Sequence, residues 1–202
     1  NASLTTKLAD SNTNNTGGNP TDSLTFTNTT GGTANFHLVF RRVSGSATGL
    51  KLYMISRSND DDFTDSYVLN QRAGIAGNHA ADFIFAMGAV PWNNPGQIEP
   101  FSSRGPNTIY FNASGTPITP VNREKPDFTA ADQVSTTVPP PLSTFGGTSA
   151  ASPNAAAVAG LMLDAANRQL TYNEVSDIFA ATAIGTGVGS WDGVHGEGRI
   201  NA

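Results

Sequence analysis

The sequence predicts an α/β protein in which a parallel-sheet domain over residues 71–202 follows a small antiparallel β domain, sandwich-like or jelly-roll-like, over residues 1–70. Three observations lead to this prediction. Before residue 56, apolar residues alternate with polar ones, which is typical of half-buried strands. Residues 81–90 form a near-continuous apolar run, as in a strand covered on both faces. Two segments with helical periodicity then lie near the C-terminus.

The first domain is predicted from alternation. Residues 3–19 are mostly Asn, Thr, Ser and Gly, which indicates a loop or frayed arm. Residues 22–43 then predict a β-hairpin that turns at Gly31 and Gly32 and buries one face. A further strand at 50–56 suggests a sandwich or jelly-roll piece. The apolar residues of the hairpin face are Leu24, Phe26, Phe36, Leu38 and Phe40.

The second domain follows a boundary that we expect between residues 67 and 78. A buried strand is predicted at 81–90, and a short apolar segment follows at Phe128. One helix is expected at 149–166, with Val158, Leu161, Met162 and Ala165 on its buried stripe. A second helix opens with a capping box from Thr171 to Glu174, with Val175, Ile178 and Phe179 facing inward.

Composition excludes several classes of function. The net charge is −5, and Arg41-Arg42 is the only basic pair, so nothing favours nucleic acid or anionic lipid as a partner. No apolar run approaches the roughly 18 residues of a membrane span, and the N-terminus does not resemble an export signal. The chain has no cysteine, so disulfides, thiolate metal sites and thiol catalysis are excluded.

Ser149 is the candidate nucleophile. A nucleophilic serine needs exposure at a tight turn, backbone N–H groups that bind the oxyanion, and a base within hydrogen-bond reach. Gly146 and Gly147 permit the turn, and a helix N-terminus supplies unpaired amides. The alternative is that Thr148 or Ser149 is an ordinary N-cap, which by frequency alone is the commoner role.

The residues around Ser149 resemble the nucleophile motif of the subtilisin-like serine peptidases, the subtilases (peptidase S8 family). That motif reads Gly-Thr-Ser-Met-Ala-x-Pro-His, and the matching residues are Gly147, Thr148, Ser149, Ala151 and Pro153. Four other segments fall in the order of the family: FAMGAV (85–90), FSSRGP (101–106), KPD (125–127) and GEGRINA (196–202). The resemblance covers about residues 76–202. It implies the C-terminal part of a subtilase catalytic domain, with the first 70 residues as a β-rich insertion.

The resemblance assigns roles at the site and also shows departures. It implies that Ser149 is the nucleophile and that its backbone N–H is one oxyanion donor, and Pro153 would stand in the first helical turn, where a missing N–H costs little. Ala150 stands where the family has Met, and Asn154 where it has His. Asp132 interrupts the usual Ala-Pro-Gly after KPD. These departures put substrate-side packing in doubt more than the nucleophile.

The rest of the catalytic triad is expected upstream. In subtilases the triad runs Asp, His, Ser along the chain, and neither the Asp motif nor the His-Gly-Thr-His motif is present here. The resemblance therefore implies that the Asp, the His and the oxyanion Asn precede this sequence. We expect the isolated chain to have little or no peptidase activity.

None of the three histidines is predicted to be the base. His37 points outward on a predicted strand. Asn78 and His79 lie too close to the strand at 85–90 to match the family's oxyanion asparagine, so they are interpreted as a loop. Asp192 and His195 follow Ser149 in the order of α/β-hydrolases, but a three-residue gap and the lack of Gly-x-Ser-x-Gly favour a closing surface turn.

Cofactors, partners and localisation follow from the resemblance. No cofactor is required. Structural calcium is common in the family, and Asp60, Asp61, Asp62 and Asp65 supply hard oxygens, although a solvated acidic loop is the favoured explanation. The expected partner is a polypeptide substrate, without nucleic acid or membrane. The expected location is extracellular or in the cell envelope.

Two other functions stay open. In the first, the chain is a pseudopeptidase or binding module whose β-rich half recognises protein or carbohydrate. In the second, the chain is a structural domain in which Ser149 only caps a helix. The exposure of Ser149 separates a nucleophile from a buried cap.

Overall fold

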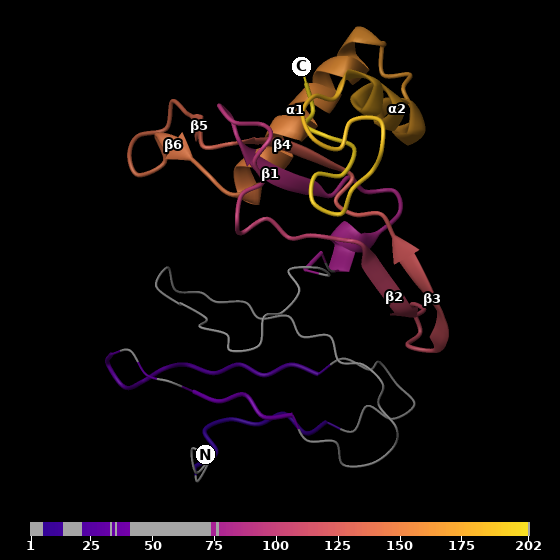
Figure 1. Cartoon of the computed structure of the whole chain (residues 1–202). Helices are drawn as coiled ribbons and strands as arrows, with labels where there is room; N and C mark the ends of the chain where they lie inside the picture. Colours follow the sequence, from indigo (N-terminus) through magenta and orange to yellow (C-terminus); the bar gives the residue numbers. More distant parts are fainter. Residues whose placement is uncertain are drawn as a thin grey trace. The chain divides into compact units, whose positions relative to one another are not determined.

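The computed structural model of the chain describes residues 6–13, 22–32, 34, 36–40, 74–75 and 77–201 (Figure 1). The chain divides into two compact units. One comprises Asn1–Asp61 with Tyr110–Thr119, and the other comprises Asp62–Ile109 with Pro120–Ala202. The predicted boundary at residue 70 stays a prediction. Because the second unit combines a parallel sheet with two α-helices, the α/β class is confirmed.

The described part of the first unit contains the predicted turn but not the predicted buried face. Gly31 has a φ of 77°, and the Asn28 side chain donates to the carbonyl of Gly32 at 2.8 Å. The rings of Phe26 and Phe36 meet edge to face at 4.6 Å, as a hairpin would bring them together. No strand is assigned to the described residues between 22 and 40. The predicted strand at 50–56 lies outside the described residues.

The apolar side chains of that face are exposed, so the prediction of their burial is wrong. Leu24, Phe26, Phe36 and Leu38 are each 42 to 47% exposed, and Phe40 is 55% exposed. Alternation indicates which side chains share a face, but it does not say whether a second layer covers them.

Strands β1 (Met87–Pro91) and β4 (Phe128–Asp132) form the parallel sheet of the second unit. Their register runs from Met87 opposite Phe128 to Pro91 opposite Asp132. The predicted strand is confirmed at its C-terminal half only. Residues 81–84 form bends and a turn instead, residues 85 and 86 belong to no element, and Phe83 is 76% exposed, because the ladder with β4 begins only at Met87.

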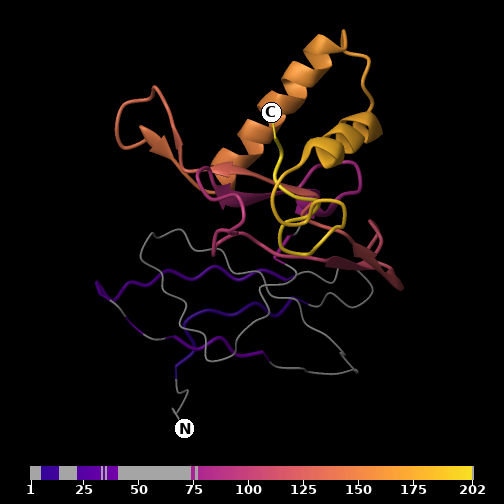
Figure 2. The same cartoon turned by 45° about the horizontal axis from the view of Figure 1, so that its top comes forward.

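Helix α1 (Thr148–Ala165) packs across both strands (Figures 1 and 2). Ala150, Ala151 and Ala155 are its buried residues, and their small side chains let the helix approach the sheet closely. The predicted bounds are confirmed within a residue or so. Leu161, at 70% exposed, and the exposed Ala165 were wrongly predicted to be buried, because the buried stripe runs through Ala151 and Ala155 to the half-buried Val158 and Met162.

Helix α2 (Tyr172–Thr182) begins at the predicted capping box. The Thr171 side chain accepts from the amide of Glu174 at 3.3 Å, and the Glu174 carboxylate accepts from the amide of Thr171 at 2.7 Å. Val175 and Phe179 are buried as predicted, whereas Ile178 is 37% exposed. Phe179 packs edge to face against Phe85 and Phe128, which places these rings in one core.

Shorter elements connect these pieces. A 3₁₀ helix, η1 (Gly77–Ala80), precedes β1. Strands β2 (Asn107–Phe111) and β3 (Pro117–Arg123) pair with each other. Strands β5 (Val134–Ser135) and β6 (Thr144–Phe145) form an antiparallel pair directly before α1. None of the helices in the described ranges has the length and apolar character that crossing a membrane requires.

The phenol of Tyr172 provides a test of this packing. Tyr172 stacks on Phe85 with ring centroids 4.4 Å apart, and burial, then the charges of Asp127 and Asp82, raise its pKa from 10.0 to about 12. We therefore expect the stability that Tyr172 contributes to be complete below pH 10 and lost as pH rises through about 12. The difference in tyrosinate absorbance between the wild type and Tyr172→Phe measures this pKa. A midpoint at the ordinary tyrosine value would contradict the packing.

Candidate active site

Ser149 stands exposed in the first turn of α1. The N-cap of this helix is Gly147, whose φ of 97° would be strained for any other residue. Because glycine has no side chain, the cap residue makes no side-chain hydrogen bond to the helix. Neither Thr148 nor Ser149 is therefore the N-cap. The capping explanation of the serine is wrong, because the N-cap lies two residues earlier, at Gly147.

The backbone amides beside Ser149 are free to bind an anion. Ala150 and Ala151 donate their N–H groups to the carbonyl of Gly147 at 2.8 and 3.2 Å. Within the described part of the chain, the N–H groups of Thr148 and Ser149 have no acceptor. The partial positive charge of a helix N-terminus is concentrated on such amides. This end of α1 can therefore stabilise a negative charge that develops beside the serine hydroxyl.

Pro153 lies in the second turn of α1, not in the first as predicted. In an α-helix, the residue at this position donates its backbone N–H to the carbonyl four residues earlier, which here is the carbonyl of Ser149. Proline has no N–H, so the carbonyl of Ser149 lacks its helical partner. The prediction was wrong because a turn holds only 3.6 residues, so a helix that begins at Thr148, or at Ser149 as expected, has Pro153 in its second turn.

Two side-chain contacts join the start of α1 to the end of β4. The carboxylate of Asp132 accepts from the amide of Gly147 at 2.5 Å, and the Asn154 side chain donates to the carbonyl of Ala131 at 3.0 Å. Sequence reasoning treated Asp132 and Asn154 only as departures from a motif. An acidic residue that ends a buried apolar strand was the signal that could have identified the first contact.

The described residues include all three histidines, and neither His79 nor His195, the two in the same unit as Ser149, forms a hydrogen bond with it. His37 is exposed, as predicted, and His79 is exposed in η1. His195 lies in a turn, as predicted, but it is only 9% exposed, so the prediction of a surface position is wrong for this histidine. Its Nδ1 lies 3.5 Å from the carboxylate of Asp192.

His195 and Ser149 lie at opposite ends of β4. The turn that contains His195 packs on the start of this strand, where the amide of Glu197 donates to the carbonyl of Asp127 at 2.8 Å. Ser149 follows Gly147, which contacts Asp132 at the far end. Five residues of extended strand separate these ends by about 16 Å. This separation excludes an Asp192–His195 base for Ser149.

The KPD segment contains a buried ion pair that has a structural role. The ammonium of Lys125 lies 2.8 and 2.9 Å from the carboxylate oxygens of Asp127 and donates to the carbonyl of Ile84 at 2.7 Å. Asp127 also accepts from the amide of Ala86 at 2.6 Å. Burial raises the pKa of Asp127, and the hydrogen bond and charge of Lys125 oppose that rise. The pair therefore fixes the segment before β1 to the start of β4.

The FSSRGP and GEG segments pack backbone against backbone near the same end of β4. A Cβ on Gly105 would lie 1.5 Å from the carbonyl oxygen of Lys125, and one on Gly196 would lie 2.2 Å from that of Asp127. The amide of Gly105 also donates to the carbonyl of Gly193 at 2.8 Å. These segments support the sheet that carries the nucleophile, and they supply no reactive group to Ser149.

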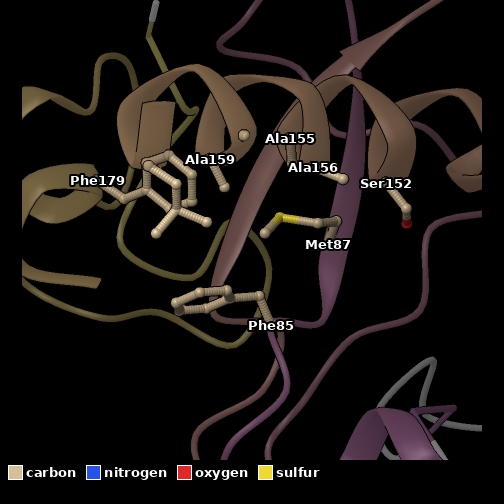
Figure 3. Close-up of a pocket in the computed structure, with 9 residues that line it drawn as sticks. Phe85, Met87, Ser152, Ala155, Ala156, Ala159 and Phe179 are labelled. Carbon is tan, nitrogen blue, oxygen red and sulfur yellow. The ribbon is translucent and has the colours of Figure 1, made fainter. Parts of the chain in front are cut away.

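An apolar groove of about 370 Å³ lies along α1. Figure 3 shows Met87 and Phe85 on one side of this groove and Ala155, Ala156 and Ala159 of the helix on the other. No titratable residue lines it, so the groove is not a catalytic centre.

The described residues contain no group of three or more His, Asp or Glu side chains that could hold a metal ion. Asp60, Asp61, Asp62 and Asp65 lie outside the described residues. Structural calcium therefore stays a prediction.

Comparison with known proteins identifies a family. The model of the subtilase family matches residues 1–198, which includes the first 75 residues that the five sequence motifs do not reach. Searches of curated proteins and of solved structures returned no match. Because the family match covers nearly the whole chain, and because the Gly-Thr-Ser turn opens α1 with an exposed serine, this chain belongs to the subtilase family of serine peptidases.

Proposed function

We propose that this chain carries the nucleophile of a serine endopeptidase, and that Ser149 is that nucleophile. The observation that carries the proposal is an exposed serine at the N-terminus of α1, beside two amides without acceptors, in a chain of the subtilase family. The substrate class that follows is polypeptide. By the same family relation, we propose that the enzyme acts outside the cell or in its envelope.

The proposed chemistry is acyl transfer. The hydroxyl oxygen of Ser149 attacks a peptide carbonyl and passes its proton to a histidine, which then protonates the leaving amine. The amide of Ser149 donates to the oxyanion, and water hydrolyses the acyl-enzyme. Since neither His79 nor His195 bonds to Ser149, we place the histidine and its aspartate in residues encoded upstream of this sequence.

The open surfaces of the second unit support this placement. Among the described strands, β1 pairs only with β4. Its other edge carries no described strand, and Ala89 on that edge instead donates to the Ser102 hydroxyl at 3.0 Å and accepts from the Glu99 amide at 2.9 Å. Helix α1 has a single charged residue, Asp164, yet Ala156 and Gly160, which line the groove, are exposed. An apolar helix and a parallel strand of this kind are normally covered on both sides. Upstream strands of a larger sheet would cover them.

A fluorophosphonate probe, which modifies only activated serines, tests the proposal. We expect Ser149 to be labelled in the natural protein with its upstream residues, and the 202-residue chain to remain unlabelled, because an unactivated serine reacts very slowly. Ser152→Ala, one turn further along the exposed side of α1, serves as the matched control and should label like the wild type.

Each outcome separates two functions. Labelling of the isolated chain would mean that it already contains the base, which would overturn the upstream placement. If the longer protein stays unlabelled at Ser149, the peptidase proposal fails, and a binding role becomes the function to examine.

A further inference from the structure

The first turns of α1 are held to the end of β4 by two neighbouring residues of that strand. Asp132 accepts the amide of Gly147 at 2.5 Å, on one side of Ser149 in sequence. Ala131 accepts the side chain of Asn154 at 3.0 Å, on the other side. The serine therefore lies between two fixed points that both belong to the C-terminal end of a buried parallel strand.

The first of these contacts pairs the amide of the N-cap residue itself and, within the described residues, leaves the amides of Thr148 and Ser149 without acceptors. A glycine N-cap has no side chain with which to satisfy the amides of the first turn. The Asp132 carboxylate reaches this end of α1 from another element and brings a negative charge to the positive end of the helix dipole. A charged acceptor also makes a shorter and stronger hydrogen bond than a neutral one.

Fold stability alone does not require a carboxylate at this position. Asp132 is 1% exposed, and within the described residues its Oδ2 has no hydrogen-bond partner. Burying an unpaired carboxylate oxygen is costly, and an apolar residue in the same strand would avoid that cost. The neighbouring strand positions are indeed apolar, namely Ala130 and Ala131.

We propose that Asp132 and Asn154 are positioning residues for catalysis. They fix the orientation of the first turns of α1, and with it the direction of the Ser149 hydroxyl and of the Ser149 amide. The inference rests on the proposed function of Ser149. Asp132 acts through Gly147, and Asn154 acts through the helix, so neither residue needs to contact the substrate.

The test compares Asp132→Ala with Asp132→Asn in the natural protein that includes the upstream residues. The alanine removes the acceptor, whereas the asparagine keeps an oxygen at the same place. We expect Asp132→Ala to lower kcat by about 10- to 100-fold with KM nearly unchanged, because a small misplacement of a nucleophile costs about this much. Asp132→Asn should recover most of the rate. Asn154→Ala should lower kcat in the same direction.

Hydrogen exchange of the Gly147 amide gives a readout that does not depend on activity. We expect this amide to exchange faster in Asp132→Ala than in the wild type, since its acceptor is gone. Asp164→Asn is the matched control: it changes an exposed carboxylate at the other end of α1 and should alter neither kcat nor this exchange.

Two results would overturn the inference: unchanged Gly147 exchange in Asp132→Ala, or wild-type kcat in that variant. Equal losses of kcat in the alanine and asparagine variants, matched by equal fractions of unfolded protein, would also overturn it and leave a role in stability only. Failure of the proposed function looks different. In that case the wild type itself shows no turnover that depends on Ser149, while Gly147 exchange still reports on the contact.

Discussion

Replacing Ser149 by alanine in the natural protein with its upstream residues is expected to lower kcat by about 10⁶-fold, the size of effect that loss of the nucleophile has in the related subtilisin. The alanine removes the atom that attacks the carbonyl but leaves the backbone amides of the first turn in place. Substrate binding should therefore change little, and KM should stay close to the wild-type value. Steady-state cleavage of an unstructured polypeptide measures both quantities.

The control for this prediction is Ser152→Ala. Ser152 lies on the exposed side of the same helix, so this variant changes a serine to alanine without touching the first turn. It should retain wild-type kcat. If Ser149→Ala keeps more than a small fraction of the wild-type rate, Ser149 is not the nucleophile, and the cleavage belongs to another group or to a contaminant.

The second large effect concerns Gly105 and the stability of the sheet. An alanine Cβ at this position would lie 1.5 Å from the carbonyl oxygen of Lys125, a distance at which backbone must move. The same stretch of backbone holds the buried Lys125–Asp127 pair. We expect Gly105→Ala to lower the free energy of unfolding by about 4 kcal/mol or more, or to prevent folding.

Gly160→Ala is the matched control for Gly105→Ala. Gly160 lies inside α1, and a Cβ there would meet no atom within 4 Å. Alanine is the better helix former by about 1 kcal/mol, so this variant should be slightly more stable than the wild type. Denaturant unfolding of both variants measures the difference. A Gly105→Ala protein as stable as the wild type would show that the FSSRGP and KPD segments do not pack as described.

The sequence was sufficient to predict the elements that have local signals. The capping box at Thr171 specifies the start of α2, and the Gly-Gly-Thr-Ser turn specifies the start of α1, because each depends on residues a few positions apart. A short apolar segment was likewise expected at Phe128, where the structure has the buried strand β4. The serine was identified as the reactive candidate from its motif, and its exposure agrees with that interpretation.

Features that depend on distant contacts could not be predicted. The strand at β1 begins only at Met87, because its partner β4 lies about forty residues away. Leu161 was expected to be buried, but in a helix made almost entirely of apolar residues several faces satisfy the same periodicity. The burial of His195 depends on how the C-terminal turn packs on the start of β4, and no local pattern encodes that contact.

The contact between Asp132 and Gly147 also has a consequence for how this family member could diverge. It closes the base of a loop that runs from Asp132 to Gly147. The two sides of this loop also pair through β5 and β6, and the last backbone hydrogen bond between them runs from the amide of Thr136 to the carbonyl of Ser143. Residues 137–142 beyond that bond are all exposed. Lengthening such a loop costs little chain entropy once its base is fixed. Insertions at this tip would therefore alter the surface beside the serine and leave the serine itself in place.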